Sequence, residues 1–388
     1  MGQGLFIVLL FDETPYLMYY QKKYIKMKEL ILTTLNQTVG QFLAYLTQTY
    51  GNPENRKRNT EILIQRFGLD SEAKMKTLDE VGQLHGGLTR ERVRQITEHG
   101  VNLLKKSEIL VKTEPFFNNL KKEIESLGSI IPEDFLMNHF SADLLIQNQI
   151  RFCLNLHNDF CYFKDNDSYK DCWSIDDKFA SNIYRSLNRF HLKLEDANVL
   201  EEKQAVKTFL SLAGEDTSPL KTRETLVWLS ICKLIGKNQL NEWGKISSPF
   251  ISPRGTPDYI YMALLKANEP LHFREISKKI TTLFKVPAHE ETCHNALISD
   301  GRFVLVGRGI YALKAWGYEE GHTLSVICEI LKDSKGLSKQ EIVKKVLEKR
   351  LIKKNTVEVG ISNNIGKLFS KSAKGLISLK KKKKVTKN

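Results

Sequence analysis

The C-terminal third of the chain repeats itself at an interval of 66 residues. At this offset Leu271 aligns with Leu337, and Glu275 aligns with Glu341. Further along, without any gap, the same offset aligns four more pairs of identical residues: Phe303 with Phe369, Gly309 with Gly375, Leu313 with Leu379, and Lys314 with Lys380. So many coincidences at a single offset indicate duplicated modules. We therefore expect two related domains, at about 255–318 and 321–382.

Each of these two segments has the pattern of three helices followed by two short strands. The stretch RFVLVGRGIYAL alternates around Gly307 and Gly309, which predicts a β-hairpin. This order of elements is that of a winged helix, whose third helix commonly enters DNA while the hairpin lies on the backbone. The basic residues that flank the hairpin are Arg302 and Arg308 in the first copy, and Lys371 and Lys374 in the second. Winged helices also bind proteins, so the pattern leaves DNA contact by either copy open.

The first copy contains PLHFREISKKI and then ISDGRFVLVGRGIYALKAWGY. These stretches resemble the HARE helix-turn-helix domain, a family that includes the N-terminal domain of the RNA polymerase delta subunit. The resemblance covers about 255–318. It implies an association with transcription or DNA, and it brings no catalytic residues.

A second pattern lies near the N-terminus, after helical stretches at about 30–50 and 59–67. Thr77 with Glu80 has the spacing of a capping box, which predicts a short helix through Leu84. The apolar face of that helix is expected to hold Leu78, Val81 and Leu84. His85, Gly86 and Gly87 then form a turn, since glycine adopts backbone angles closed to most residues. Thr89 is expected to cap the next helix.

That next helix has two different faces. Its inner face, which is expected to pack on the preceding helices, holds Val93, Ile96, Gly100 and Leu103. Its exposed face carries donors and acceptors that suit base edges: Arg for guanine, Glu for cytosine and Gln for adenine. These residues are Arg90, Glu91, Arg94, Gln95 and Glu98, with Arg92 on the flank. The alternative is a solvated helix in which Glu and Arg stabilise each other at helical spacing.

The residue order RFGLDSEAKMKTLDEVGQLHGGLTRERVRQI resembles region 4 of primary bacterial sigma factors, over about 59–106. In that family the second helix docks in the major groove of the promoter, and the domain surface contacts RNA polymerase. The resemblance implies that Arg90, Glu91 and Arg94 read bases, and that Thr89, Arg92 and Gln95 support them or contact phosphate. Two departures are clear. The turn HGGL holds one residue more than the usual family turn, and no aromatic-rich segment resembles the promoter-melting region, so the chain is not a complete sigma factor.

The remaining segments are less distinctive. The stretch FCYFKDNDSYKDCWSI predicts a hairpin that turns at Asp165 to Asp167, so we expect another winged helix at about 116–176. Residues 180–250 are expected to form a helical unit. Residues 1–27 have an unusual composition and are interpreted as an N-terminal extension before the domain at 28–110. The sequence leaves open whether Met27 is the native start.

Charge and motif content narrow the class of protein. A net charge of +14 and a pI near 9.3 favour a polyanionic partner. Residues 351–388 hold eleven Lys and a single acid, Glu358, with a basic run at Lys380 to Lys384 and a predicted tail at 383–388. The six cysteines have neither metal-site nor redox spacing, and the common phosphate-loop, nucleophile-elbow and zinc-protease motifs are missing. We therefore expect no enzyme, no cofactor and no metal. No stretch reaches the ~20 apolar residues of a membrane helix.

Together these patterns predict a mainly α protein with small β-hairpins, built as a multidomain array of helix-turn-helix and winged-helix modules. The expected function is that of a DNA-binding transcription regulator or sigma-like factor, cytoplasmic and nucleoid-associated, which reads double-stranded DNA through the helix that starts at Thr89 and also contacts RNA polymerase core. The alternative is an RNA polymerase accessory subunit whose DNA contact is incidental. The sequence does not fix the target site, the direction of regulation or the oligomeric state.

Overall fold

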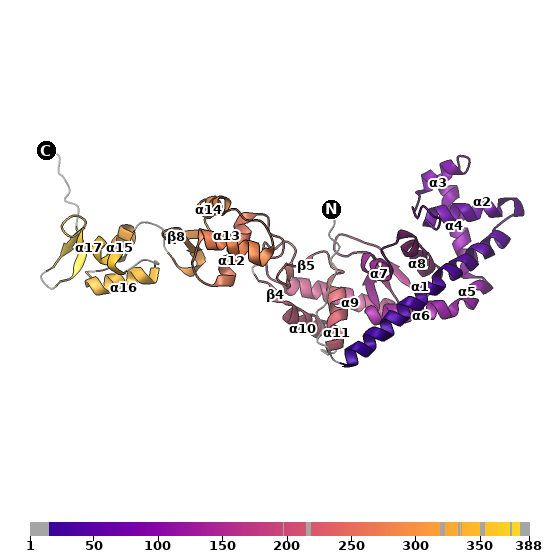
Figure 1. The fold of residues 1–388 in the computed structure, drawn as a ribbon, viewed down its shortest axis with the longest axis horizontal. Coiled ribbons are helices and arrows are strands. Elements are labelled where there is room, and N and C mark those ends of the chain that lie inside the picture. Colours follow the sequence, from indigo (N-terminus) through magenta and orange to yellow (C-terminus); the bar gives the residue numbers. More distant parts are fainter. Residues whose placement is uncertain are drawn as a thin grey trace. The chain divides into compact units, whose positions relative to one another are not determined.

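The structure is a computed structural model, and it describes residues 15–196, 198–214, 219–318, 323–332, 334, 336–349, 354–372 and 375–380. These residues are mostly helical, with small antiparallel sheets of two or three strands (Figure 1). This agrees with the predicted fold class at the level of secondary structure. The predicted basic tail at 383–388, and residues 1–14 of the predicted extension, lie outside the described residues.

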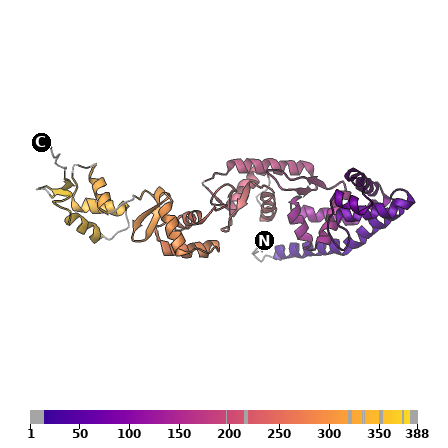
Figure 2. The same cartoon turned by 90° about the horizontal axis from the view of Figure 1, so that it is seen from above.

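Five helices form the N-terminal part: α1 (Pro15–Thr49), α2 (Pro53–Phe67), α3 (Leu78–Leu84), α4 (Arg90–Lys105) and α5 (Glu108–Lys112). Helix α1 is one long helix (Figure 2). It is already helical well before Met27, where the helical pattern in the sequence becomes clear. Helices α2, α3 and α4 contact one another, and α1 runs along α2 and α6.

The rest of the chain contains four repeats of one element order, in which helix, strand, helix and helix are followed by two strands. The first repeat consists of α6 (Glu114–Leu127), β1 (Ile130–Pro132), α7 (Glu133–Phe140), α8 (Leu144–Leu156), β2 (Cys161–Phe163) and β3 (Cys172–Ser174). The second consists of α9 (Asp177–Lys193), β4 (Leu200–Glu201), α10 (Glu202–Ala213), α11 (Pro219–Leu229), β5 (Ile235–Lys237) and β6 (Glu242–Lys245). In both sheets the last strand lies between the other two.

The third and fourth repeats follow the same order. The third consists of α12 (Thr256–Ala267), β7 (Leu271–His272), α13 (Phe273–Phe284), α14 (Glu290–Ser299), β8 (Phe303–Gly307) and β9 (Ile310–Leu313), with strand order β7-β9-β8. The fourth consists of α15 (Thr323–Lys332), α16 (Lys339–Lys349), α17 (Lys354–Ser362), β10 (Phe369–Lys371) and β11 (Ile377–Leu379). An isolated bridge between Leu337 and Ile377 takes the place of its first strand.

Strand pairing in the last two repeats follows the 66-residue offset of the sequence. In the third repeat Leu271 pairs with Tyr311, and Phe303 pairs with Leu313. The fourth repeat makes the same two pairings 66 residues later, Leu337 with Ile377 and Phe369 with Leu379. The hairpin predicted around Gly307 and Gly309 is confirmed, and Gly309 has a φ of 69°. The short first strand was not predicted, since two residues are too few to show alternation.

The second repeat was expected to be helical only, and this expectation was incomplete. Its three-stranded sheet pairs Leu200 with Trp243, as the sheet of the first repeat pairs Ile131 with Trp173. The hairpin predicted on either side of Asp165 to Asp167 is confirmed, because β2 and β3 pair in antiparallel register.

Hydrophobic cores group these elements. A single cluster extends from Ile31 in α1 to Trp173 in β3 and includes Val227 of α11, so the segments 28–110 and 116–176 share one core. Separate clusters fill the third and fourth repeats. By its internal contacts the chain divides into two compact units within the second repeat: one comprises residues up to 194 with 202–235, and the other comprises 195–201 with residues from 236 onward.

Candidate nucleic-acid interface

Helix α3 begins at the predicted capping box. The backbone NH of Glu80 donates to the Thr77 hydroxyl at 3.2 Å, and the backbone NH of Thr77 donates to the Glu80 carboxylate at 2.7 Å. The second bond, as the largest cause, lowers the pKa of Glu80. Two free NH groups at the helix start are thereby satisfied, which fixes where α3 begins.

The turn after α3 depends on three glycines. Gly86 and Gly87 have φ angles of 81° and 76°, as expected for a turn built on glycine. The NH groups of Gly87 and Leu88 both donate to the carbonyl of Gly82, at 3.0 and 2.9 Å. A Cβ atom on Gly82 would lie 2.1 Å from the Leu88 carbonyl oxygen. Gly82 therefore allows the chain to fold back tightly on α3 before α4 starts.

Helix α4 is capped by Thr89, whose hydroxyl accepts a hydrogen bond from the NH of Arg92 at 3.3 Å. Its buried face holds Val93, Ile96, Gly100 and Leu104. Leu103, which was expected on this face, is only partly buried, and the neighbouring Leu104 takes its place.

Leu84 was expected on the packed face of α3, and this was wrong: its side chain is 59% exposed. The buried face of α3 is centred on Val81 and Gly82. At about 100° per residue, Leu84 lies about 60° from Val81 on the side away from Gly82, and about 160° from Gly82, so it falls outside the covered face. The capping box and spacing predicted the helix correctly, but they did not define which face is covered.

All the residues predicted to bind DNA, whether by reading bases or by supporting them, are exposed on α4 or at its cap. Arg90, Glu91, Arg92, Arg94 and Gln95 are all exposed, as is the cap residue Thr89. The Arg90 side chain is 70% exposed, and that of Arg94 is 47% exposed. They lie on the first two turns, on the side of the helix away from the buried Val93 and Ile96, and we call this polar surface the α4 face.

Two of the three arginines of the α4 face, Arg90 and Arg94, are paired with carboxylates. Arg94 binds Glu91 at 2.7 Å and also pairs with Glu98. Arg90 lies 3.4 Å from Asp79 of α3, a contact across the turn that the sequence did not reveal. Hydrogen bonds from Arg94 and then Gln95 lower the pKa of Glu91 to about 2. Positive and negative side chains therefore alternate on this surface, and the lowered pKa keeps the Glu91 carboxylate ionised at physiological pH.

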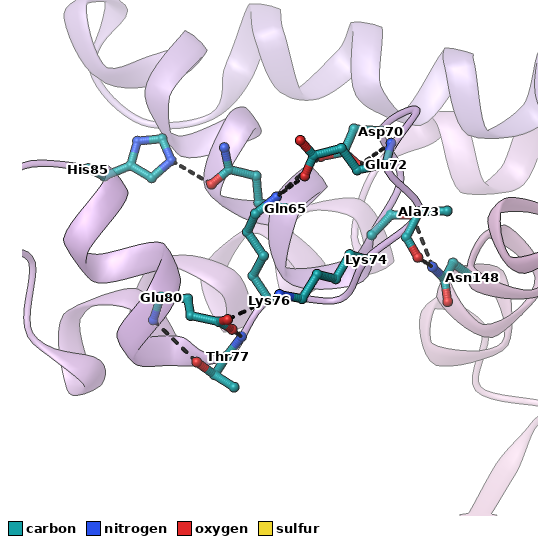
Figure 3. A network of polar contacts seen from close by, with 11 residues as sticks. Gln65, Asp70, Glu72, Ala73, Lys74, Lys76, Thr77, Glu80, His85 and Asn148 are labelled. Atoms are coloured by element: carbon teal, nitrogen blue, oxygen red, sulfur yellow. Dashed lines mark hydrogen bonds and ion pairs between the residues drawn. The ribbon is translucent and has the colours of Figure 1, made fainter.

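The loop between α2 and α3 is fixed by a side chain from the first repeat (Figure 3). The amide of Asn148 in α8 donates to the carbonyls of Gly68 and Ala73, at 3.1 and 2.9 Å, and Asn148 is itself only 4% exposed. At the other end of α3, His85 lies 3.0 Å from the Gln65 amide oxygen. These contacts hold α2, α3 and α8 together. Asn148 lies between Gln147 and Gln149, so no local pattern in the sequence marked it as buried.

The two arginines predicted beside the hairpin of the third repeat, Arg302 and Arg308, lie in different surroundings. Arg302 is bound by two carboxylates, Asp258 at 2.9 Å and Asp300 at 2.7 Å, and its hydrogen bonds lower the pKa of Asp300. Arg302 therefore holds α12 to the hairpin, whereas Arg308 is exposed. In the fourth repeat Lys371 is exposed, and Lys374 lies outside the described residues.

Comparison with known proteins gives no match: neither a protein-family model, nor a curated protein, nor a solved structure matches the chain. Among the described residues no group of three or more His, Cys, Asp or Glu side chains is placed to hold a metal ion. Nor does any helix in the described ranges have the length and apolar character needed to cross a bilayer.

Proposed function

We propose that this chain is a DNA-binding protein of transcription initiation, and that α3 and α4 form a helix-turn-helix which reads duplex DNA. One observation carries the proposal. The exposed α4 face presents three arginines and a glutamine on a helix whose other side is buried, and which is fixed to α3 by a glycine turn. A helix positioned in this way suits the major groove, where such side chains distinguish base pairs.

The carboxylates on the α4 face favour specific over unspecific binding. Glu91 and Glu98 repel phosphates, and they occupy Arg94 when no base does. On a site with guanine in the matching position, Arg94 exchanges these partners for the two acceptors of the base. Replacing Arg94 with Ala is expected to cost about 1 to 3 kcal/mol on the preferred site, because one bidentate contact is lost.

In this proposal the repeats are winged helices that add contacts to DNA or to RNA polymerase, and the protein acts without catalysis at the nucleoid in the cytoplasm. Several weak contacts on one chain raise the effective concentration for one another. The basic run from Lys380 to Lys384 adds contacts to phosphate; of this run only Lys380 lies among the described residues.

The test is selection of bound duplexes from a random DNA pool with the full chain. Wild type is compared with the double variant Arg90→Ala, Arg94→Ala. A matched control is Arg185→Ala, Arg189→Ala on α9, which removes two exposed arginines at the same spacing of four residues. We expect a motif for wild type and for the control, and its loss in the α4 variant. Absence of any motif with wild type would refute sequence reading.

A second candidate is an RNA polymerase accessory subunit with incidental DNA contact. Two observations favour it: Leu84 of α3 is exposed, and Arg90 and Arg94 of α4 already have carboxylate partners. An exposed leucine suits a protein partner better than DNA. Co-purification with core polymerase in the absence of promoter DNA, sensitive to Leu84→Ser but not to Arg94→Ala, would identify this function.

A further inference from the structure

The four repeats differ in how much of their third helix is available to a partner. Helix α8 of the first repeat is covered by α1, α2 and α4, and its one exposed residue is Leu144, in the first turn. Helix α11 of the second repeat packs on α6, β1 and α9, and the Trp228 indole donates to the Gly128 carbonyl at 2.8 Å. A helix that is covered by other parts of the chain cannot enter a groove. The two open third helices are α14 and α17.

Helices α14 and α17 can be compared position by position. Each is anchored by two buried residues four apart, Cys293 and Leu297 in α14 and Val357 and Ile361 in α17. These anchors match at an offset of 64 residues, two fewer than in the strands, so the ungapped alignment at 66 does not hold within this helix. At the offset of 64 the exposed Glu290 of α14 corresponds to the exposed Lys354 of α17.

The charge difference extends beyond that pair. Glu291 of α14 corresponds to Asn355 of α17, and at the hairpin offset of 66 the exposed Leu305 corresponds to the exposed Lys371. At the same offset Gly301 corresponds to Lys367. All four changes make the surface of the fourth repeat more basic or less acidic. Over whole segments, residues 323–380 hold thirteen Lys and Arg against five Asp and Glu, whereas 255–318 hold eight against six.

Other lysines of the fourth repeat lie next to this surface. The Lys339 ammonium is 3.2 Å from the Ser362 hydroxyl at the end of α17, and the Lys380 ammonium donates to the Gly366 carbonyl at 2.6 Å. Lys354 is 68% exposed, at 3.8 Å from Glu358. The third repeat differs, because Arg274 pairs with Glu290 at 3.2 Å and α14 exposes no cation of its own.

We infer that α17 and the hairpin of the fourth repeat form a second nucleic-acid contact, which binds the phosphate backbone of duplex DNA without reading its sequence. We call this surface, made of Lys354, Lys367 and Lys371 with Lys339 and Lys380 beside it, the α17 face. The matching surface of the third repeat does not bind DNA, since Glu290 and Glu291 repel phosphate. The inference rests on the proposed function that this chain binds duplex DNA, and it names where the sequence-independent part of the binding lies.

The experiment measures the affinity of the full chain for a random-sequence duplex at several salt concentrations. The test variant carries Lys354→Gln, Lys367→Gln and Lys371→Gln. The matched control carries Lys278→Gln, Lys285→Gln and Lys314→Gln, three exposed lysines of the third repeat. Each lysine on a phosphate contributes about one unit to the slope of log affinity against log salt. We expect the test variant to lose about three units of slope and at least about tenfold in affinity at about 0.1 M salt, and the control to stay close to wild type.

The outcomes separate this inference from the proposed function. The variant Lys354→Arg, Lys367→Arg, Lys371→Arg keeps the charges and should restore binding, whereas a misfolded repeat would not recover. Equal losses in test and control variants, or none in either, would overturn the inference. The inference would also be overturned if the test variant kept its affinity for duplex DNA but lost binding to RNA polymerase, because the α17 face would then bind protein. Since the α17 face reads no bases, selection from the random pool should return the same motif for the test variant as for wild type. The double variant Arg90→Ala, Arg94→Ala tests the proposed function instead, and it is expected to lose the motif.

Discussion

At the scale of single residues, the position of α4 depends on Gly100. A Cβ atom there would lie 2.7 Å from the Cζ atom of Tyr50 and 2.8 Å from a methyl group of Leu63. Tyr50 is fully buried, and its hydroxyl donates to the carbonyl of Ile96 in α4. Moving the Tyr50 ring aside would break this buried hydrogen bond. The close approach of α4 to α1 and α2 requires a residue without a side chain at this position.

We expect Gly100→Ala to lower the free energy of unfolding by about 1 to 3 kcal/mol, because the extra methyl group overpacks the core. Urea denaturation followed by circular dichroism measures this. Gly40→Ala is the matched control, since Gly40 lies exposed within α1 and a Cβ there meets no atom within 4 Å. The control should be more stable by about 0.5 to 1 kcal/mol, as alanine is the better helix former. Equal effects of the two changes would contradict the packing account.

The ionisation of Glu91 gives a prediction about pH. Its pKa falls from an ordinary value near 4.5 to about 2 in the folded protein, mainly through Arg94. A lowered pKa in the folded state means that the stabilisation is present above about pH 4.5 and is lost as the pH falls towards 2. Because the pair is exposed, the effect is small.

We therefore expect Glu91→Gln to have a lower Tm than wild type at pH 7, and this difference to shrink between pH 4.5 and pH 2. Thermal denaturation of both proteins over this pH range measures the difference in Tm. The other carboxylates titrate in both proteins, so their effect on Tm cancels in this difference. A difference that remains constant down to pH 2 would show that the Glu91 carboxylate contributes nothing to folding.

At the scale of elements, the sequence predicted features that depend on neighbouring residues, and it did not predict features that depend on contacts between distant parts of the chain. The capping box fixes the start of α3, and the two glycines fix the turn, since both depend on residues a few positions apart. The exposure of Leu84 and the burial of Asn148 depend on partners elsewhere in the fold, which no local pattern encodes. The sheet of the second repeat was missed for another reason: β4 has two residues and β5 contains a glycine, so neither shows alternation.

Asn148 links helix α8 to the loop between α2 and α3, and this link can be tested. Replacing it with Ala removes the donor of two carbonyls in the loop between α2 and α3, so we expect a loss of about 1 to 3 kcal/mol in stability. Asn148→Asp should be worse, because a carboxylate would face the Gly68 and Ala73 carbonyls. Chemical denaturation ranks the variants, and hydrogen exchange should become faster in residues 68–76. An Asp variant as stable as wild type would contradict the assigned hydrogen bonds.

At the scale of the whole molecule, the chain divides into two compact units, so it is not expected to unfold in one step. Hydrogen exchange with mass spectrometry on the full chain should show that Gly100→Ala speeds opening of peptides from 28–176 and leaves those from 255–318 unchanged. Tyr311→Ala, in the core of the third repeat, should have the opposite pattern. Faster exchange throughout the chain in either variant would mean that the two units unfold together.

Because four repeats with the same element order follow one another, strands of different repeats can pair wrongly while the chain folds. The first strand of each repeat pairs with the last strand of its own hairpin in the same way, so it also fits the hairpin of a neighbouring repeat. Such strand exchange is a characteristic misfolding route of tandem domains. The residue opposite the first strand is Trp173, Trp243, Tyr311 and Ile377 in the successive repeats. The first two repeats share a tryptophan here, but the residue changes between the second and third repeats and again between the third and fourth, so at those two boundaries a wrong hairpin would bring a side chain of another size into the core.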